Sequence, residues 1–125
     1  MHELAAASRL IDVLADAARR AGVPRVLGVR VAIGELSCLD PDTFAFAFEV
    51  ASRGGPAAGC ALEIARVVAR LKCRTCGRER GGHLLDACPG CGAMGVDVLE
   101  GREARIERVR LEDPAVAAAG PREAP

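Results

Sequence analysis

Residues Cys73 to Gly92 read CRTCGRERGGHLLDACPGCG and hold the most informative pattern of this chain. It holds two C-x-x-C-G pairs, Cys73/Cys76 and Cys88/Cys91, separated by eleven residues. Two cysteines three apart on a tight turn aim both sulfurs at one point, and two such turns form the tetrahedron of thiolates that Zn²⁺ binds. The glycine after each pair permits a positive φ, which lets backbone amides point back at sulfur. We therefore predict a zinc ribbon with these four cysteines as the ligands.

Four protein ligands leave no open coordination position, so we interpret this zinc as structural rather than catalytic. A segment this short and polar would fold only with its metal. An iron–sulfur cluster stays open on ligand type alone. A redox pair is disfavoured, because it is typically a single C-x-x-C beside a βαβ unit. Nucleic-acid binding is also disfavoured, because the ribbon lacks an aromatic or strongly basic surface.

The other cysteines and the loop histidine are given no primary metal role. His83 lies between the two pairs and is expected to be a solvated loop residue, with an exchanging ligand as the alternative. Cys38 and Cys60 lack a ligand-like neighbour and are predicted to be small buried hydrophobes. The negative charge of a zinc tetrathiolate would be offset by four nearby cations, Lys72, Arg74, Arg78 and Arg80.

The residues before the module predict a helix, a strand and a second helix. Apolar residues recur at helical spacing between positions 4 and 21, at Leu4, Ala7, Leu10, Ile11, Leu14 and Ala18. Period-two alternation over 29–33 predicts a half-buried strand. Asp40-Pro41 is typical of an N-cap followed by proline at the first helical position. The helix that follows should pack one side against the sheet, with Phe44, Ala47, Phe48 and Ala51.

Strands on both sides of the module complete the pattern. Leu62 and Ile64 mark a strand before it, and Val96 and Val98 lead into Gly101-Arg102, where a hairpin turn is expected. The strand after that turn holds Ile106, Val109 and Leu111. Its apolar phase slips between Ile106 and Val109, which predicts a bulge or the end of the strand.

The predicted fold class is α/β (α+β), with two helices on a small sheet and an inserted zinc-ribbon module. Residues 1–70 would form an α/β domain, completed by the strand in 98–113. Residues 71–97 would form the module. Residues 114–125 are alanine, glycine and proline without periodicity and predict a disordered tail.

Composition narrows the classes of partner. The chain has 17 basic and 17 acidic residues, and this balance disfavours nucleic-acid or anionic membrane binding. No segment reaches the ~18 consecutive apolar residues of a membrane span. The start lacks the basic region of a secretory signal, so we expect a cytoplasmic protein. In the cytoplasm, the six cysteines of this chain are better explained by metal binding or burial than by disulfides. No catalytic motif is found, so no enzyme is expected.

The amino terminus reads Met1-His2-Glu3. The Met1 amine, the His2 amide nitrogen and the His2 imidazole Nδ1 close adjacent chelate rings, and the Glu3 amide supplies a further nitrogen. Four such donors in a plane suit Ni²⁺ or Cu²⁺. The first amides of a helix have no intrahelical acceptor, so metallating them costs no helical hydrogen bond. These residues alone favour the alternative, a frayed terminus.

The whole pattern resembles the HypA/HybF family of hydrogenase nickel-incorporation proteins, from Met1 to about Asp113. The resemblance is carried by the cysteine pairs and by Met1-His2-Glu3, Gly34-Glu35-Leu36, Phe48-Glu49, Gly59-Cys60-Ala61-Leu62-Glu63-Ile64, Gly101-Arg102-Glu103 and Ile106. Ala104 departs from it, standing where a larger apolar residue is commoner.

The resemblance reverses the interpretation of the amino terminus. It implies that Met1, His2 and Glu3 form a nickel site through the amine, the imidazole and backbone nitrogens, and that the four cysteines hold structural zinc. It also implies a nickel metallochaperone, a monomer or homodimer. Its partners would be a nickel-binding GTPase of the hydrogenase maturation system and the large-subunit precursor of [NiFe]-hydrogenase. Some relatives also serve urease.

Overall fold

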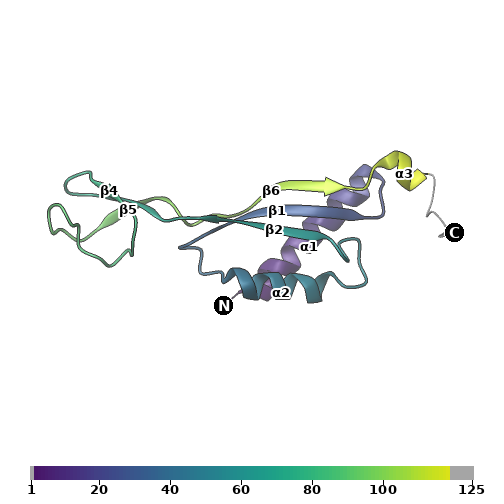
Figure 1. The fold of residues 1–125 in the computed structure, drawn as a ribbon, viewed down its shortest axis with the longest axis horizontal. Coiled ribbons are helices and arrows are strands. Elements are labelled where there is room, and N and C mark those ends of the chain that lie inside the picture. Colours follow the sequence, from purple (N-terminus) through teal and green to yellow (C-terminus); the bar gives the residue numbers. More distant parts are fainter. Residues whose placement is uncertain (1, 119–125) are drawn as a thin grey trace.

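A computed structural model of the chain describes residues 2–118. It contains three helices and six strands: α1 (Glu3–Ala21), β1 (Val26–Gly34), α2 (Pro41–Ser52), β2 (Ala61–Val67), β3 (Arg70–Cys73), β4 (Glu79–Arg80), β5 (Val96–Glu100), β6 (Ala104–Leu111) and α3 (Pro114–Ala118). The strands form two separate three-stranded sheets. The described part of the chain is elongated, with one sheet toward each end (Figure 1).

The first sheet has the order β2-β1-β6. β1 and β2 are parallel, with Gly28 opposite Ala61, and α2 lies in the connection between them. β1 and β6 are antiparallel. The register shifts where Arg30 faces Arg108 and Val31 faces Ile106, so one extra residue lies in β6 at that point. Of the bulge and the strand end predicted at this point, the structure shows the bulge.

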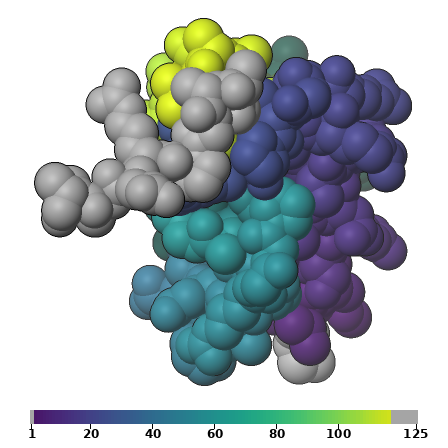
Figure 2. All heavy atoms as spheres, turned by 90° about the vertical axis from the view of Figure 1, so that its right-hand side faces the viewer, coloured from purple at the N-terminus to yellow at the C-terminus, as the bar shows by residue number. Residues whose placement is uncertain are grey.

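The core of this half lies between the sheet and the two long helices. α1 and α2 pack side by side, which Figure 2 shows from the end of the molecule. The buried apolar residues come from both helices, from β1 and from the adjoining loops: Ala7, Leu10, Leu14, Ala18, Val23, Val26, Val29, Val31, Ile33, Phe44, Ala47, Phe48 and Ala57. The predicted inner face of α1 is wrong at one position: Leu4 is 62% exposed. Glu3 beside it is only 7% exposed.

Local chemistry explains where the helices begin and end. Gly22 at φ +70° ends α1, and its amide donates to the carbonyls of Ala18 and Arg19. The Asp40 carboxylate accepts a hydrogen bond of 2.8 Å from the Thr43 amide, and proline follows at the first helical position of α2. The N-cap predicted at Asp40 is therefore confirmed.

The second sheet has the order β4-β3-β5 and is antiparallel throughout. The hairpin expected at Gly101-Arg102 is wrong. β5 pairs with β3, whereas β6 pairs with β1 in the other sheet. The turn therefore connects one sheet to the other, because β5 and β6 each pair with a strand that is distant in sequence.

The two segments that connect the sheets are tied to the loop after β1. The Gly34 amide donates to the carbonyl of Glu103, and the Leu36 amide donates to the carbonyl of Gly101. The Glu35 carboxylate accepts a 2.8 Å hydrogen bond from the Ala69 amide. The loop after β1 is thus hydrogen-bonded both to the segment between β2 and β3 and to the segment between β5 and β6.

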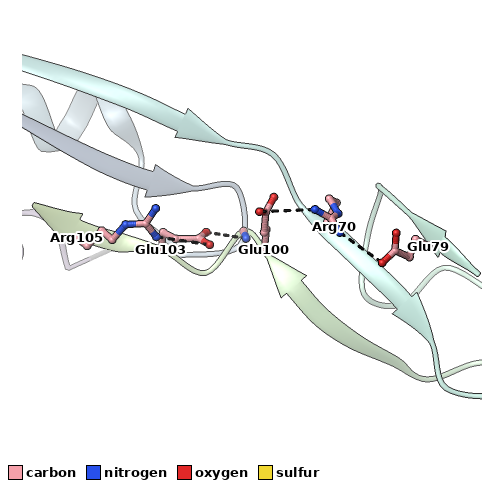
Figure 3. A network of polar contacts seen from close by, with 6 residues as sticks. Arg70, Glu79, Glu100, Glu103 and Arg105 are labelled. Carbon is pink, nitrogen blue, oxygen red and sulfur yellow. Dashed lines mark hydrogen bonds and ion pairs between the residues drawn. The ribbon is translucent and has the colours of Figure 1, made fainter. Parts of the chain in front are cut away.

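Charged side chains continue along this junction. Arg70 lies between Glu79 at 3.4 Å and Glu100 at 3.7 Å, so it links β3 to both of its neighbouring strands (Figure 3). On the other side, the Glu103 carboxylate accepts from the Gly101 amide at 2.7 Å and lies 3.8 Å from Arg105.

Two predictions are corrected at other points. Residues 114–118 form helix α3, where an unstructured tail is predicted; the rest of that tail lies outside the described residues. Cys38 is exposed, with φ +65°, and is not a buried hydrophobe. Cys60 is half-buried and packs against the core.

No helix within residues 2–118 is long and apolar enough to span a membrane. The division into domains stays a prediction.

Candidate metal sites

The first cysteine pair lies on a tight turn at the end of β3. The Gly77 amide donates to the Cys73 carbonyl at 2.9 Å, and Gly77 has φ +79°. The Cys73 amide donates to the carbonyl of Arg78. A residue with a Cβ would be strained at this φ.

The second pair repeats the same geometry in the loop before β5. The Gly92 amide donates to the Cys88 carbonyl at 2.8 Å, and Gly92 has φ +75°. The Cys88 amide donates to the carbonyl of Ala93. The two C-x-x-C-G sequences therefore fold into two matching turns.

The two turns bring four sulfurs together. The Sγ atoms of Cys73, Cys76, Cys88 and Cys91 all lie within 4.8 Å of one another. The Sγ atoms are 3.7 Å apart for Cys73 and Cys91, and 3.6 Å apart for Cys76 and Cys88. Zn–S bonds of about 2.3 Å in a tetrahedron place the sulfurs roughly 3.8 Å apart. The donor set and its spacing therefore fit Zn²⁺.

The pKa values of the cysteine thiols favour a cation at the centre of the cluster. The backbone amides of Cys76 and Thr75 hold the pKa of Cys73 below its ordinary value. The amides of Cys91 and Gly90 lower the pKa of Cys88 to about 6.

Cys91 behaves in the opposite way. Its largest single influence, the Ala93 amide, lowers the pKa, but burial and the three neighbouring thiols outweigh it and raise the pKa to about 11. Four thiols this close do not all ionise on their own. A divalent ion is the charge that would hold all four as thiolates.

The basic residues near the cluster act in different ways. A Cβ at Gly90 would lie 3.0 Å from Nη1 of Arg78, so this guanidinium lies against the second turn. Arg74 instead pairs with Asp97 at 2.9 Å. Arg80 donates to the carbonyls of Gly81, His83 and Asp86 and so organises the loop between the pairs. Charge compensation by Lys72, Arg74, Arg78 and Arg80 stays a prediction, with the Arg78 guanidinium lying against one of the two cysteine turns.

His83 is exposed in that loop, as predicted, and only its backbone is engaged. Its amide donates to Oδ2 of Asp86 at 3.3 Å, and its carbonyl accepts from Arg80. Within residues 2–118, the four cysteines are the one group of three or more potential ligands close enough to share an ion.

The predicted nickel residues lie at the start of α1. Met1 lies outside the described residues. His2 is the N-cap residue; its side chain is exposed and makes no capping hydrogen bond, and its carbonyl accepts from the Ala6 amide at 2.9 Å. The imidazole is therefore open to solvent.

Glu3 has a role that sequence reasoning missed. Its carboxylate is buried, and Oε1 accepts a 3.0 Å hydrogen bond from the Asp40 amide at the start of α2. Helical periodicity places Leu4 rather than Glu3 on the inner face of α1. Periodicity therefore does not predict the contact between Glu3 and Asp40. The joint presence of Met1-His2-Glu3 in the resemblance is the signal that singles this residue out.

Comparison with known families supports the same class of protein. A family described as "Hydrogenase/urease nickel incorporation, metallochaperone, hypA" matches residues 1–111. The chain is 40% identical to a hydrogenase maturation factor HypA of Streptomyces avermitilis, over 90% of this chain and 88% of that one. It is 37% identical to a HypA of Geobacter metallireducens, over 90% of this chain and 100% of that one.

Solved structures agree with the fold. The solution structure of the Ni metallochaperone HypA from Helicobacter pylori superposes with a TM-score of 0.61 at 28% identity, covering 89% of this chain and 97% of that one. A second structure, described as the solution structure of HypA protein, gives a TM-score of 0.66 at 27% identity, covering 90% and 97%.

Proposed function

Because this chain belongs to the HypA family of nickel-incorporation metallochaperones for hydrogenase maturation, we propose that it binds Ni²⁺ at its amino terminus and delivers the ion to the large-subunit precursor of a [NiFe]-hydrogenase. The family is one of maturation factors and not of enzymes, as the lack of catalytic motifs predicts. The observation that carries the proposal is the family match over residues 1–111, which includes the terminal Met-His-Glu.

The chemistry of the proposed nickel site uses main-chain nitrogens. The Met1 amine, the His2 imidazole and amide, and the Glu3 amide would bind the ion in one plane. Two features support this role. The His2 side chain is exposed at the N-cap, and amides in the first turn of a helix need no intrahelical acceptor. The same exposure would let a recipient protein take the ion.

The four cysteines would hold Zn²⁺ in a structural role. Four thiolate ligands close the coordination sphere, which leaves no position for substrate or water. The sulfur spacing and the lowered pKa values of Cys73 and Cys88 support this assignment. The ion would order the two loops of the second sheet, residues 74–78 and 81–95, which are largely exposed.

The proposed partners follow from hydrogenase maturation. They are a nickel-binding GTPase of the maturation system and the hydrogenase large-subunit precursor, both met in the cytoplasm. The family description also names urease, so a urease precursor is a further recipient to test in transfer assays.

A nickel titration tests the proposal. Calorimetry of the zinc-loaded protein should show Ni²⁺ binding that is lost in His2→Ala and when one residue is added before Met1. Binding should weaken as the pH falls, because the amine and the imidazole must both be deprotonated to act as ligands. Zinc content, measured on the same samples, should not change. Equal nickel binding by the extended protein would overturn the proposed site.

A further inference from the structure

β6 is an edge strand of the first sheet, and its outer side is unpaired within residues 2–118. It pairs with β1 alone, over Val26–Ile33 of that strand. Figure 1 shows it as the outermost strand of this sheet. A free edge of eight residues offers backbone N–H and C=O groups to an incoming strand.

The side chains of β6 carry positive charge on the face of the sheet away from α1 and α2. The register places Arg110 opposite Gly28 and Arg108 opposite Arg30. Residues opposite one another point to the same face. Arg105, opposite Ala32, lies on this face as well.

Two of these four arginines have acidic partners among the described residues and two do not. Arg30 forms ion pairs with Glu63 and Glu107, and Arg105 has Glu103 at 3.8 Å. Arg108 and Arg110 form no ion pair with any described residue. In a chain with equal numbers of acidic and basic residues, this is a local excess of arginine along one strand edge. β2, the opposite edge, shows Ala61, Glu63 and Ala65 to the same face and has no such excess.

The helix side of the same edge is mainly apolar, with Arg9 and Arg105 also among its lining residues. A groove of about 280 Å³ lies between α1 and the first half of β6, lined by Leu10, Val13, Ile33 and Ile106 among others. Val13 is 50% exposed and Ile106 is 37% exposed, so the groove is open to solvent. It also contacts Ala6, one helical turn from His2.

We propose that the outer edge of β6 binds an extended acidic segment of a partner protein as a fourth strand of the sheet. Successive side chains of a strand point to opposite faces. Acidic residues of the segment would pair with Arg105, Arg108 and Arg110, and the alternate apolar residues would enter the groove beside Val13 and Ile106. The segment would therefore have alternating acidic and apolar residues.

A second copy of the chain is a poorer occupant of this edge. Pairing β6 with β6 would bring the unpaired arginines of two identical strands onto one face, and like charges across strands are destabilising. An acidic segment instead neutralises them. Its position beside Ala6 would also place part of the partner near the amino terminus, which the proposed function makes the site of transfer.

Peptide binding tests the proposal directly. The probe is a terminally blocked peptide as long as β6 in which glutamate alternates with valine, and the control peptide has lysine in place of glutamate. The glutamate peptide should bind the zinc-loaded protein at low salt, protect β6 amides from hydrogen exchange, and bind more weakly as salt is added. The lysine peptide should not bind.

Two variants locate the contact. Arg108→Glu with Arg110→Glu should weaken binding by roughly tenfold or more. The matched charge change Arg20→Glu with Arg53→Glu, on the exposed ends of α1 and α2, should not weaken it. Because the double change in β6 can also disturb the sheet, Val13→Lys provides a second test: it alters only the exposed face of α1 and should weaken binding without lowering Tm.

The proposal is overturned if the glutamate peptide does not bind, or if both peptides bind equally. It is also overturned if β6 amides gain no protection, or if neither the arginine reversal nor Val13→Lys weakens binding. Nickel binding, measured separately on the same variants, should be unchanged. Loss of nickel binding in His2→Ala with intact peptide binding would separate the transfer site from the docking edge.

Discussion

The carboxylate of Glu3 accepts a hydrogen bond of 3.0 Å from the backbone amide of Asp40. This contact joins the first turn of α1 to the N-cap residue of α2, across 37 positions of sequence. The Asp40 carboxylate in turn accepts from the Thr43 amide. The proposed nickel-binding terminus is therefore fixed to the starts of two helices rather than to one.

Replacing Glu3 should loosen this terminus. In Glu3→Ala the Asp40 amide loses its acceptor, so Tm should fall by a few degrees and amide exchange at Ala6 and Ala7 should speed up. Glu3→Gln keeps an oxygen acceptor and should stay closer to the wild type in both measurements. Equal melting and exchange for all three proteins would show that the contact does not hold the helix start.

Asp40 should make stability depend on pH in the acid range. Hydrogen bonds from the Thr43 side chain and amide lower the pKa of Asp40 below its usual 3.8. A lowered pKa in the folded state means that the stabilisation is fully present above the unfolded value and is lost as the pH falls through the folded value. The loss should therefore occur below about pH 4.

Two variants isolate this effect in thermal melts. Asp40→Asn keeps a capping side chain but does not titrate, so its contribution should stay constant from pH 5 to about pH 2. Asp40→Ala should be less stable than both at neutral pH. A wild-type acid transition identical to that of Asp40→Asn would assign the acid sensitivity to other carboxyl groups.

Gly34 should be intolerant of any side chain. A Cβ there would lie 2.0 Å from the Gly101 carbonyl oxygen and 2.8 Å from the Glu103 amide nitrogen, both of them backbone atoms. Gly34→Ala should therefore push the segment 101–103 away from β1 and cost about 1–3 kcal/mol of unfolding free energy, measured by denaturant unfolding. Gly55→Ala is the control: its Cβ would approach no closer than 3.7 Å to the Ser52 carbonyl oxygen, and it should change stability by less than about 0.5 kcal/mol. Similar values for the two variants would contradict the close approach.

Removing one cysteine should abolish zinc binding and unfold the second sheet. Cys88→Ser should lower the zinc content, measured by plasma mass spectrometry, from a single ion per chain to near zero. Hydrogen exchange should then rise in β3, β4 and β5 but not in the core of α1, because that core contains no metal ligand. Cys38→Ser is the matched control, since Cys38 lies outside the cluster. Zinc retained by Cys88→Ser would show that the four thiols do not act as one site.

The local features of this protein are predictable from its amino-acid sequence. Two C-x-x-C-G pairs specify two tight turns, Asp40-Pro41 specifies a helix start, and periodicity indicates α1, β1, β2 and β6, because each of these depends on residues a few positions apart. The short elements β3, β4 and α3 carry no such pattern. The bulge in β6 could be predicted for the same reason, because the alternation of apolar residues changes phase between Ile106 and Val109.

Which helices and strands pack or pair with one another depends on the tertiary structure. β5 and β6 were expected to form a hairpin but belong to different sheets, because their partners β3 and β1 are distant in sequence. The burial of Glu3, the exposure of Leu4 and the hydrogen bonds of Glu35 depend on contacts made across tens of residues. Such contacts depend on how the chain packs and produce no periodic pattern along the sequence. No local pattern therefore predicts them.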